Sequence, residues 1–300
     1  MNRRWILPSP SRNCSPAPVV TKPRVALAIF DVDNTLFDWV DMWHASFSEI
    51  LNGVQARSGL SRATLVEEFR SIHQQHRTTE YASAVAELPS LQRRHPGEDL
   101  LQLYRDVLSD AERHRQQRLK LYPTVFETLE AIKSSGTYLA AYTETMECYA
   151  GPRLKRLDLD RIFDRVYLPE HRAEPYEAGS LICERRYVSA DRLKPDPRVL
   201  GEIVSDAGVS PEFAIYVGDS RTRDVAMARR AGVTAVWASY GARPERVEYG
   251  LLREVVHWTD EDLARERSSA EMHGAEILDP HFTLRNELRE LLDLFEFESV

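Results

Sequence analysis

The chain has 300 residues, of which 43% are hydrophobic and 29% are charged. This composition argues against a disordered chain or a coiled coil, and the length allows one large α/β domain or a core that carries an inserted module. The net charge of −8 disfavours a nonspecific nucleic-acid binder, because such proteins usually carry a net basic field. The basic stretch 113–120, RHRQQRLK, has helical spacing, and we interpret it as the solvated face of a helix.

The N-terminal segment does not have the pattern of a targeting sequence. Residues 1–23 begin with basic residues but lack a continuous apolar region, and they are rich in proline and serine, so we predict a disordered leader. No run of about eighteen apolar residues occurs, and no membrane partner is expected. The cysteines Cys14, Cys148 and Cys183 are odd in number and form no CxxC pair, which favours a reducing cytoplasm over a disulfide framework or a zinc site.

Short apolar runs predict the strands of the fold, and helical patterns lie between them. Near-continuous apolarity is typical of strands that are covered on both faces, so alternation with helices predicts a doubly wound parallel sheet of the α/β class. The strands are expected at 25–30, 137–143, 213–219 and 233–239, with helices at 123–136 and 222–232.

The C-terminal half contains further elements and two segments of unassigned role. Residues 276–282 predict a last short strand, and residues 284–295 predict a closing amphipathic helix. The segments 169–189 and 245–274 are interpreted as embellishments of the core.

Strand patterns are absent from residues 39–120, where helical patterns follow one another. We therefore predict an all-α insertion at 39–120 and an α/β core formed by 24–38 and 121–300. The insertion begins directly after an acidic cluster, so it is expected to lie over that cluster.

Polar residues follow the ends of the predicted strands. Asp31 and Asp33 follow the first strand, Asp219 follows the third, and Asp224 comes one helical turn later. Because ligands of open α/β sheets bind beyond the carboxyl ends of the strands, we expect these groups to lie together. Clustered carboxylates repel one another unless a cation holds them, and Mg²⁺ prefers oxygen ligands combined with a substrate phosphate.

Two further residues provide groups for a phosphate. Thr143 follows the second strand, and Lys194 lies in the sequence LKPDP before the third. A hydroxyl, a lysine and free backbone N–H groups are suited to bind phosphate oxygens. The combination predicts a site for phosphoryl transfer.

These motifs resemble those of the haloacid dehalogenase superfamily of hydrolases. Asp31, Asp33 and Thr35 match its DxDx(T/V) first motif, Thr143 matches the second, and Lys194 matches the third. The fourth motif is matched by GDSRTRD, residues 218–224. The helical insertion resembles the type 1 cap of this superfamily, and the intervals after Thr143 and after residue 241 are longer than usual.

The resemblance implies a role for each matching residue. Asp31 is expected to attack phosphorus and form an aspartyl-phosphate, and Asp33 to act as general acid and then as general base. Mg²⁺ is expected to be held by Asp31, the backbone carbonyl of Asp33 and Asp219, with Asp224 either as a further ligand or as a support for the other ligands. Thr143 and Lys194 are expected to bind the phosphoryl oxygens. The implied enzyme is a phosphatase with a small phosphorylated substrate, because phosphatases and phosphomutases of the family carry aspartate at the position of Asp33 and dehalogenases do not.

Other interpretations remain open at this point. A phosphomutase of the same fold and a non-catalytic binding or regulatory protein are alternatives to the phosphatase, and the sequence leaves the oligomeric state open. Considered singly, Thr143 and Asp224 could be helix caps, and Lys194 could be a surface lysine. Asp38 is expected to make only local hydrogen bonds, and His73 and His76 are interpreted as part of a solvated helix face.

Overall fold

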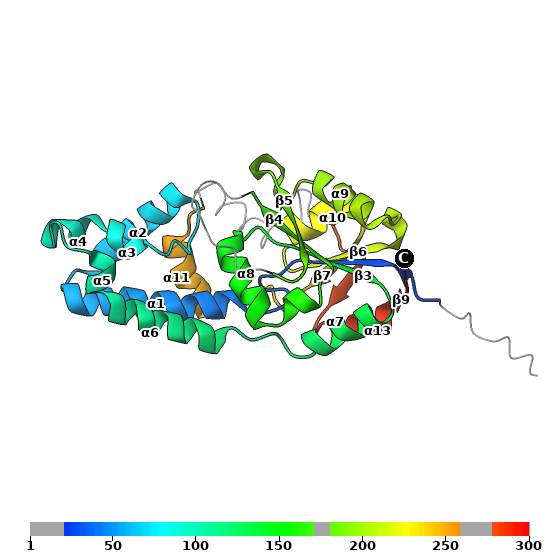
Figure 1. The fold of residues 1–300 in the computed structure, drawn as a ribbon, viewed down its shortest axis with the longest axis horizontal. Coiled ribbons are helices and arrows are strands. Elements are labelled where there is room, and N and C mark those ends of the chain that lie inside the picture. Colours follow the sequence, from blue (N-terminus) through cyan, green and yellow to red (C-terminus); the bar gives the residue numbers. More distant parts are fainter. Residues whose placement is uncertain (1–20, 171–180, 259–277, 300) are drawn as a thin grey trace, which may run out of the picture.

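The computed structural model describes residues 21–170, 181–258 and 278–299. Its centre is a seven-stranded parallel sheet with helices on both faces (Figure 1). In spatial order the strands are β5 (Glu184–Val188), β4 (Arg165–Pro169), β3 (Tyr138–Tyr142), β2 (Leu27–Phe30), β6 (Ala214–Gly218), β7 (Thr234–Ala238) and β8 (Phe282–Leu284). The predicted doubly wound α/β sheet is confirmed.

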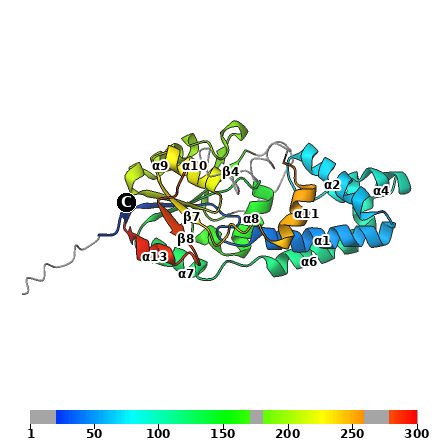
Figure 2. The same cartoon turned by 180° about the vertical axis from the view of Figure 1, so that it is seen from behind.

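Strand β2 is central and buried along its whole length. Successive side chains of a strand point to opposite faces, so β2 contributes to two separate cores. Ala28 and Phe30 pack on the face that carries α7 (Val125–Ser134), α8 (Glu147–Arg156) and α13 (Glu290–Leu294). Leu27 and Ile29 pack on the face that carries α9 (Arg198–Ala207) and α10 (Ala226–Arg230), and Figure 2 shows the two groups of helices on either side of the sheet.

A helical module lies between β2 and α7 in the sequence and beside the sheet in space (Figure 1). Its long helix α1 (Trp39–Ser58) begins at Asp38, whose side chain accepts a hydrogen bond from the backbone N–H of Asp41, and ends at Gly59 with φ of 66°. Such caps satisfy backbone groups that the helix itself leaves unpaired. The remaining helices are α2 (Arg62–His76), α3 (Ala84–Glu87), α4 (Pro89–Arg94), α5 (Leu100–Leu103) and α6 (Arg105–Arg118).

One helix of this module comes from a distant part of the chain. Helix α11 (Val247–Val255) follows β7, yet Leu251, Leu252 and Val255 are buried in the same apolar cluster as α1 and α2. Figures 1 and 2 both show α11 among the helices of the module. The segment 245–274 was interpreted as an embellishment of the core, and this part of it instead completes the helical module.

The segment 169–189 and the C-terminal elements also differ from the sequence-based expectations. The segment 169–189 contains β5, which forms an edge of the sheet. The last strand, β8, begins where the predicted one ends, and residues 276–277 lie outside the described residues. The closing helix α13 is shorter than predicted because it begins only at Glu290, after a turn that follows β8. It is followed by β9 (Glu296–Phe297), which pairs with β1 (Arg24–Val25).

The predicted leader lies outside the described residues except at its end. Residues 21–23 are described, and the carbonyl of Pro23 accepts a hydrogen bond from the N–H of Glu296 at 3.0 Å. Among the helices that the structure describes, none is long and apolar enough to cross a membrane.

Candidate active site

The central strands bring the predicted motifs to one edge of the sheet. β2 pairs with β3 on one side and with β6 on the other. Asp31, Thr143 and Asp219 each follow one of these strands directly, at its carboxyl end. The three motifs are therefore neighbours because their strands are neighbours.

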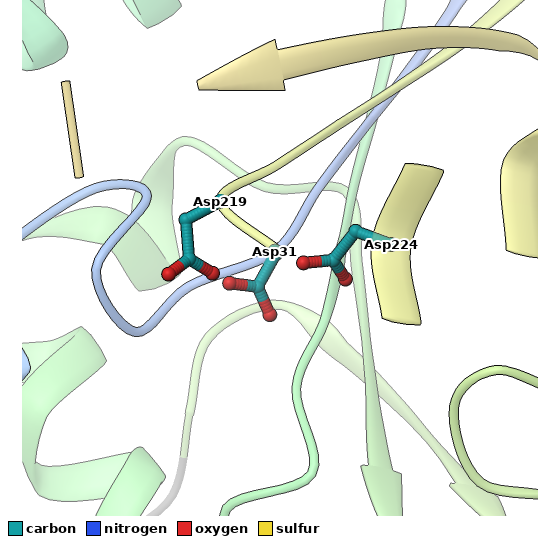
Figure 3. Close-up of side chains that lie close together, drawn as sticks. All are labelled: Asp31, Asp219 and Asp224. Carbon is teal, nitrogen blue, oxygen red and sulfur yellow. The ribbon is translucent and has the colours of Figure 1, made fainter. Parts of the chain in front are cut away.

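Three carboxylates converge at this edge. One oxygen from each of Asp31, Asp219 and Asp224 lies within 4.8 Å of the others, and Figure 3 shows the side chains directed toward one another. Asp31 and Asp224 are buried, at 6% and 2% exposure. A buried cluster of three acids needs positive charge to be stable in its ionised form.

Asp224 is held by the turn that follows β6. A π-helical turn, Arg221–Val225, places its carboxylate where it accepts hydrogen bonds from the N–H of Ser220 at 2.9 Å and from the hydroxyl of Tyr216 at 3.0 Å. The side chain of Ser220 caps the turn, so capping does not explain the position of Asp224. Gly218 makes the approach possible, because a Cβ there would lie 2.5 Å from the carboxylate carbon.

Lys194 is part of the acidic cluster and is not a surface lysine. Its ammonium group forms ion pairs with Asp31 and, at 2.9 Å, with Asp224, and its side chain is 5% exposed. Burial disfavours the charged form, but Asp224 and Asp31 outweigh this effect and raise the pKa of Lys194 well above its usual value. One permanent cation therefore faces three acids.

The excess of negative charge in the cluster, together with burial, raises the pKa values of two of its carboxyl groups. Burial, opposed by Lys194 and reinforced by Asp224, raises the pKa of Asp31 to about 7. Burial and the charges of Asp31 and Asp224 also raise the pKa of Asp219 well above its usual value. Oxygen donors that repel one another in this way fit a hard divalent cation such as Mg²⁺, which would favour their ionised forms.

Thr143 lies beside the cluster and is almost fully buried, at 1% exposure. Its hydroxyl accepts a hydrogen bond from the N–H of Thr145 at 3.1 Å. Helix α8 begins only at Glu147, with Met146 at its N-cap position, so Thr143 is not a helix cap.

Asp33 has a different environment from the three clustered acids. Its carboxylate accepts a hydrogen bond from the hydroxyl of Thr145 at 2.6 Å and lies 3.6 Å from the guanidinium of Arg153. Burial raises the pKa of Asp33, and the charge of Arg153 partly opposes this shift. The side chain keeps 22% exposure, as a group that exchanges protons with a substrate or water requires.

Arg153 and Glu80 are site residues that the sequence analysis did not identify. They form an ion pair in which each side chain is 5% exposed, and the indole N–H of Trp39 donates to the other carboxylate oxygen of Glu80 at 3.3 Å. Arg153 lies in α8 of the core, whereas Glu80 lies between α2 and α3 of the helical module. No sequence pattern links the two positions, because their contact depends on how the module lies over the sheet.

Asp38 and His73 make contacts with distant residues that the sequence did not predict. Asp38 makes the expected local hydrogen bond, and its carboxylate also pairs with Arg246 at 2.6 Å, near the start of α11. The interpretation of His73 as a solvated residue is wrong. It is 1% exposed, and its Nδ1 donates to the carbonyl of Val255 at 2.7 Å, because α11 covers this face of α2.

The family of the chain follows from its sequence over most of its length. Residues 25–232 match the model of the haloacid dehalogenase-like hydrolases, and the chain belongs to this family. The family match together with the curated phosphatase relatives identifies the chain as a hydrolase of the phosphatase type.

Several curated proteins are similar to this chain over part or most of its length. A phosphoglycolate phosphatase of Agrobacterium fabrum is 28% identical over 74% of this chain and 84% of its own length. Phosphoglycolate phosphatase 1 of Pseudomonas aeruginosa is 33% identical, over 41% of this chain and 38% of its own length. A glyceraldehyde 3-phosphate phosphatase of Methanopyrus kandleri is 29% identical over 48% of this chain and 51% of its own length.

Solved structures show the same fold. A 2-haloacid dehalogenase from Pseudomonas syringae pv. Tomato DC3000 aligns with a TM-score of 0.53 at 20% identity, over 90% of this chain and 97% of its own. A HAD phosphatase from Thermococcus onnurineus aligns with a TM-score of 0.52 at 20% identity, over 92% of this chain and all of its own.

Proposed function

We propose that the protein is a Mg²⁺-dependent phosphomonoester hydrolase that acts on a small soluble phosphorylated metabolite through an aspartyl-phosphate. The observation that carries the proposal is the pairing of two unlike carboxyl groups. Asp31 lies within the acidic cluster and is paired with Lys194, whereas Asp33 stands apart from that cluster beside Thr145. The first environment suits a nucleophile and the second suits an acid–base group.

In the first step an oxygen of Asp31 attacks phosphorus, and the bond from phosphorus to the leaving oxygen breaks. Asp33 donates its proton to that oxygen, so the product leaves as a neutral alcohol. The ion pair with Lys194 and the hydrogen bond from Thr35 at 3.0 Å hold the carboxylate of Asp31 in one orientation. An oriented nucleophile lowers the entropic part of the barrier.

In the second step Asp33, now ionised, takes a proton from water. The oxygen of that water attacks phosphorus, the bond to Asp31 breaks, and inorganic phosphate is released with both carboxyl groups restored. Positioned proton transfer of this kind contributes roughly 10²- to 10⁴-fold to the rate.

Asp31, the backbone carbonyl of Asp33, Asp219 and Asp224 would hold Mg²⁺. When bound, Mg²⁺ supplies positive charge that allows an anionic nucleophile to approach an anionic phosphate. Thr143 and Lys194 would bind the phosphoryl oxygens next to this site. Their burial at the same sheet edge supports these roles.

The helical module, residues 39–120 completed by α11, would act as a cap that excludes water during the first step. A cap over the site favours small substrates over proteins or nucleic acids. Two relatives suggest candidate substrates by their names, namely phosphoglycolate and glyceraldehyde 3-phosphate. Cytoplasmic location belongs to this proposal, and both cysteines within the described residues, Cys148 and Cys183, are free thiols as a reducing compartment requires.

The experiment that tests the proposal is phosphate release from p-nitrophenyl phosphate and from a panel of metabolite phosphates. We expect turnover with Mg²⁺, loss of turnover in EDTA, and recovery when Mg²⁺ is added in excess. Full activity after exhaustive chelation would contradict the metal requirement. Isomerised sugar phosphate without phosphate release would instead indicate a phosphomutase, and Mg²⁺ binding without turnover across the panel would indicate a non-catalytic protein.

A further inference from the structure

Arg153 has a guanidinium edge that its neighbours do not fully use. Nη2 is paired with Glu80, whereas Nη1 makes no hydrogen bond within the described part of the chain and lies 3.6 Å from Oδ1 of Asp33. The residue is 4% exposed, and a buried donor without an acceptor costs stability. Such a cost is retained where the donor serves a ligand.

The position of Arg153 relative to the reacting groups limits what this ligand can be. If Asp33 protonates the leaving oxygen, the leaving group must lie against Asp33. The clustered acids and Lys194 take the phosphoryl side of the site, so Arg153 lies on the leaving-group side. Because Arg153 lies 3.6 Å from Asp33, a group bound to Arg153 must be close to the ester oxygen that Asp33 protonates. The positive charge of Arg153 favours a negatively charged group at that position.

We propose that Arg153 is a specificity-determining residue that binds a carboxylate on the leaving group, and that the enzyme selects phosphate esters of short hydroxy acids. This inference rests on the proposed function. Hydrogen bonds from a guanidinium to a carboxylate are among the strongest in proteins, which makes the residue able to distinguish an acid from an uncharged alcohol.

Glu80 has a defined part in this arrangement. It comes from the cap, and its carboxylate occupies one edge of the guanidinium, as a substrate carboxylate would. Glu80 therefore neutralises Arg153 when no substrate is bound, and the substrate takes over this contact or adds to it at Nη1. The indole of Trp39 keeps Glu80 at this position.

A purely structural role for the ion pair would give a different result. The pair joins the core to the cap, so its loss could weaken cap closure for every substrate alike. A role in recognition affects only substrates with a charged leaving group. Two matched esters separate the two roles, namely 2-phosphoglycolate and ethyl phosphate, which has the same carbon frame without the carboxylate.

The experiment compares kcat and KM for both esters in the Mg²⁺-loaded wild-type protein and three variants. Arg153→Gln combined with Glu80→Gln removes both charges and avoids a single buried charge, and Arg153→Lys keeps the positive charge. Arg156→Gln is the control, because it removes an exposed arginine from the same helix. Thermal unfolding of each variant establishes that it is folded.

We expect the double variant to lose about 10- to 100-fold in kcat/KM for 2-phosphoglycolate, mainly through KM, and to change less than about threefold for ethyl phosphate. Arg153→Lys should retain part of the preference. Equal losses for both esters, or no loss for 2-phosphoglycolate, would overturn the assignment of Arg153 while leaving the phosphatase intact. Failure of the wild-type protein to hydrolyse either ester or p-nitrophenyl phosphate would overturn the proposed function itself.

Discussion

Asp31 and Asp33 are two residues apart, yet their surroundings assign them different chemistry. Asp31 faces Lys194 and the acidic cluster, whereas Asp33 faces Thr145 and Arg153. Both residues lie in the loop that follows β2, beyond the regular strand, and their carboxylates have different partners there. Under the proposed function, one short motif supplies both the nucleophile and the acid–base group.

Replacement of Asp33 tests its role separately from that of Asp31. Asp33→Asn keeps the shape and a hydrogen-bond acceptor for Thr145, but it removes the transferable proton. We expect kcat for an alkyl phosphate to fall by roughly 10²- to 10⁴-fold. For p-nitrophenyl phosphate, whose leaving group needs little protonation, the first step should be affected less, so that a burst of p-nitrophenol precedes slow turnover. Equal loss of both steps would contradict the assignment.

The sequence could predict the motif residues but not their partners. The motif residues follow apolar runs, and a parallel sheet brings the ends of such strands together whatever the rest of the chain does. No such rule predicts the contact between Arg153 and Glu80, because the two residues are 73 positions apart and lie in different modules. The family resemblance assigned roles only to motif positions, and neither residue is one.

At the scale of elements, helix α11 connects the core to the helical module. It packs its apolar face into the helical module, and the carbonyl of Val255 near its end accepts the hydrogen bond from His73. The helix leaves the core after Arg246, which pairs with Asp38 at the start of α1. The module is thus tied to the core by a connection additional to those flanking 39–120.

The buried His73 makes the stability of the module depend on pH. Burial, opposed in part by the hydrogen bond to Val255, lowers the pKa of His73 to about 4. The unfolded chain takes up a proton at this residue near pH 6.5, whereas the folded chain does so only near pH 4. The stability contributed by His73 is therefore fully present above pH 6.5 and is lost as the pH falls to about 4.

We expect this loss to be about 3 kcal/mol in the free energy of unfolding. His73→Gln keeps a donor for the carbonyl of Val255 and removes the titration, so its stability should fall less between pH 7 and pH 4 than that of the wild type. Denaturant unfolding at a series of pH values measures the difference. His114→Gln is the control, because it removes a histidine of α6 whose side chain is 38% exposed. A wild-type pH profile that matches that of His73→Gln would contradict the prediction.

The helical patterns predicted the helices of the module within residues 39–120, but they did not predict that α11 belongs to it. The spacing of apolar residues predicts an amphipathic helix wherever it occurs, and it does not say which apolar surface the helix covers. His73 lies at helical spacing from Leu65 and Phe69, on the apolar face of α2, but the sequence does not show that α11 supplies the carbonyl that it binds. Strand β5 was missed because it lies at an edge of the sheet and its sequence, ERRYV, is mostly charged. Strand β4 is internal, but its apolar run of Val166, Tyr167 and Leu168 is too short to stand out in the sequence.

At the scale of the whole molecule, the arrangement separates two tasks. The sheet holds the acidic cluster, Lys194 and Thr143 at the edge where β2, β3 and β6 end. The helical module brings Glu80 to the opposite side of Asp33, against Arg153. Under the proposed function, the core supplies groups for the phosphoryl chemistry, and the contact between core and module supplies groups for the leaving group.

The central claim is that phosphate passes through a covalent bond to Asp31. The most direct measurement is acid quench of the Mg²⁺-loaded enzyme during turnover of a substrate with labelled phosphorus, followed by peptide mapping. The account predicts label on the peptide that contains Asp31, and it predicts that Asp31→Asn shows neither label nor more than roughly 10⁻³ of the wild-type rate. Wild-type phosphate release by the Asp31→Asn variant, or label carried on a different side chain, would contradict it.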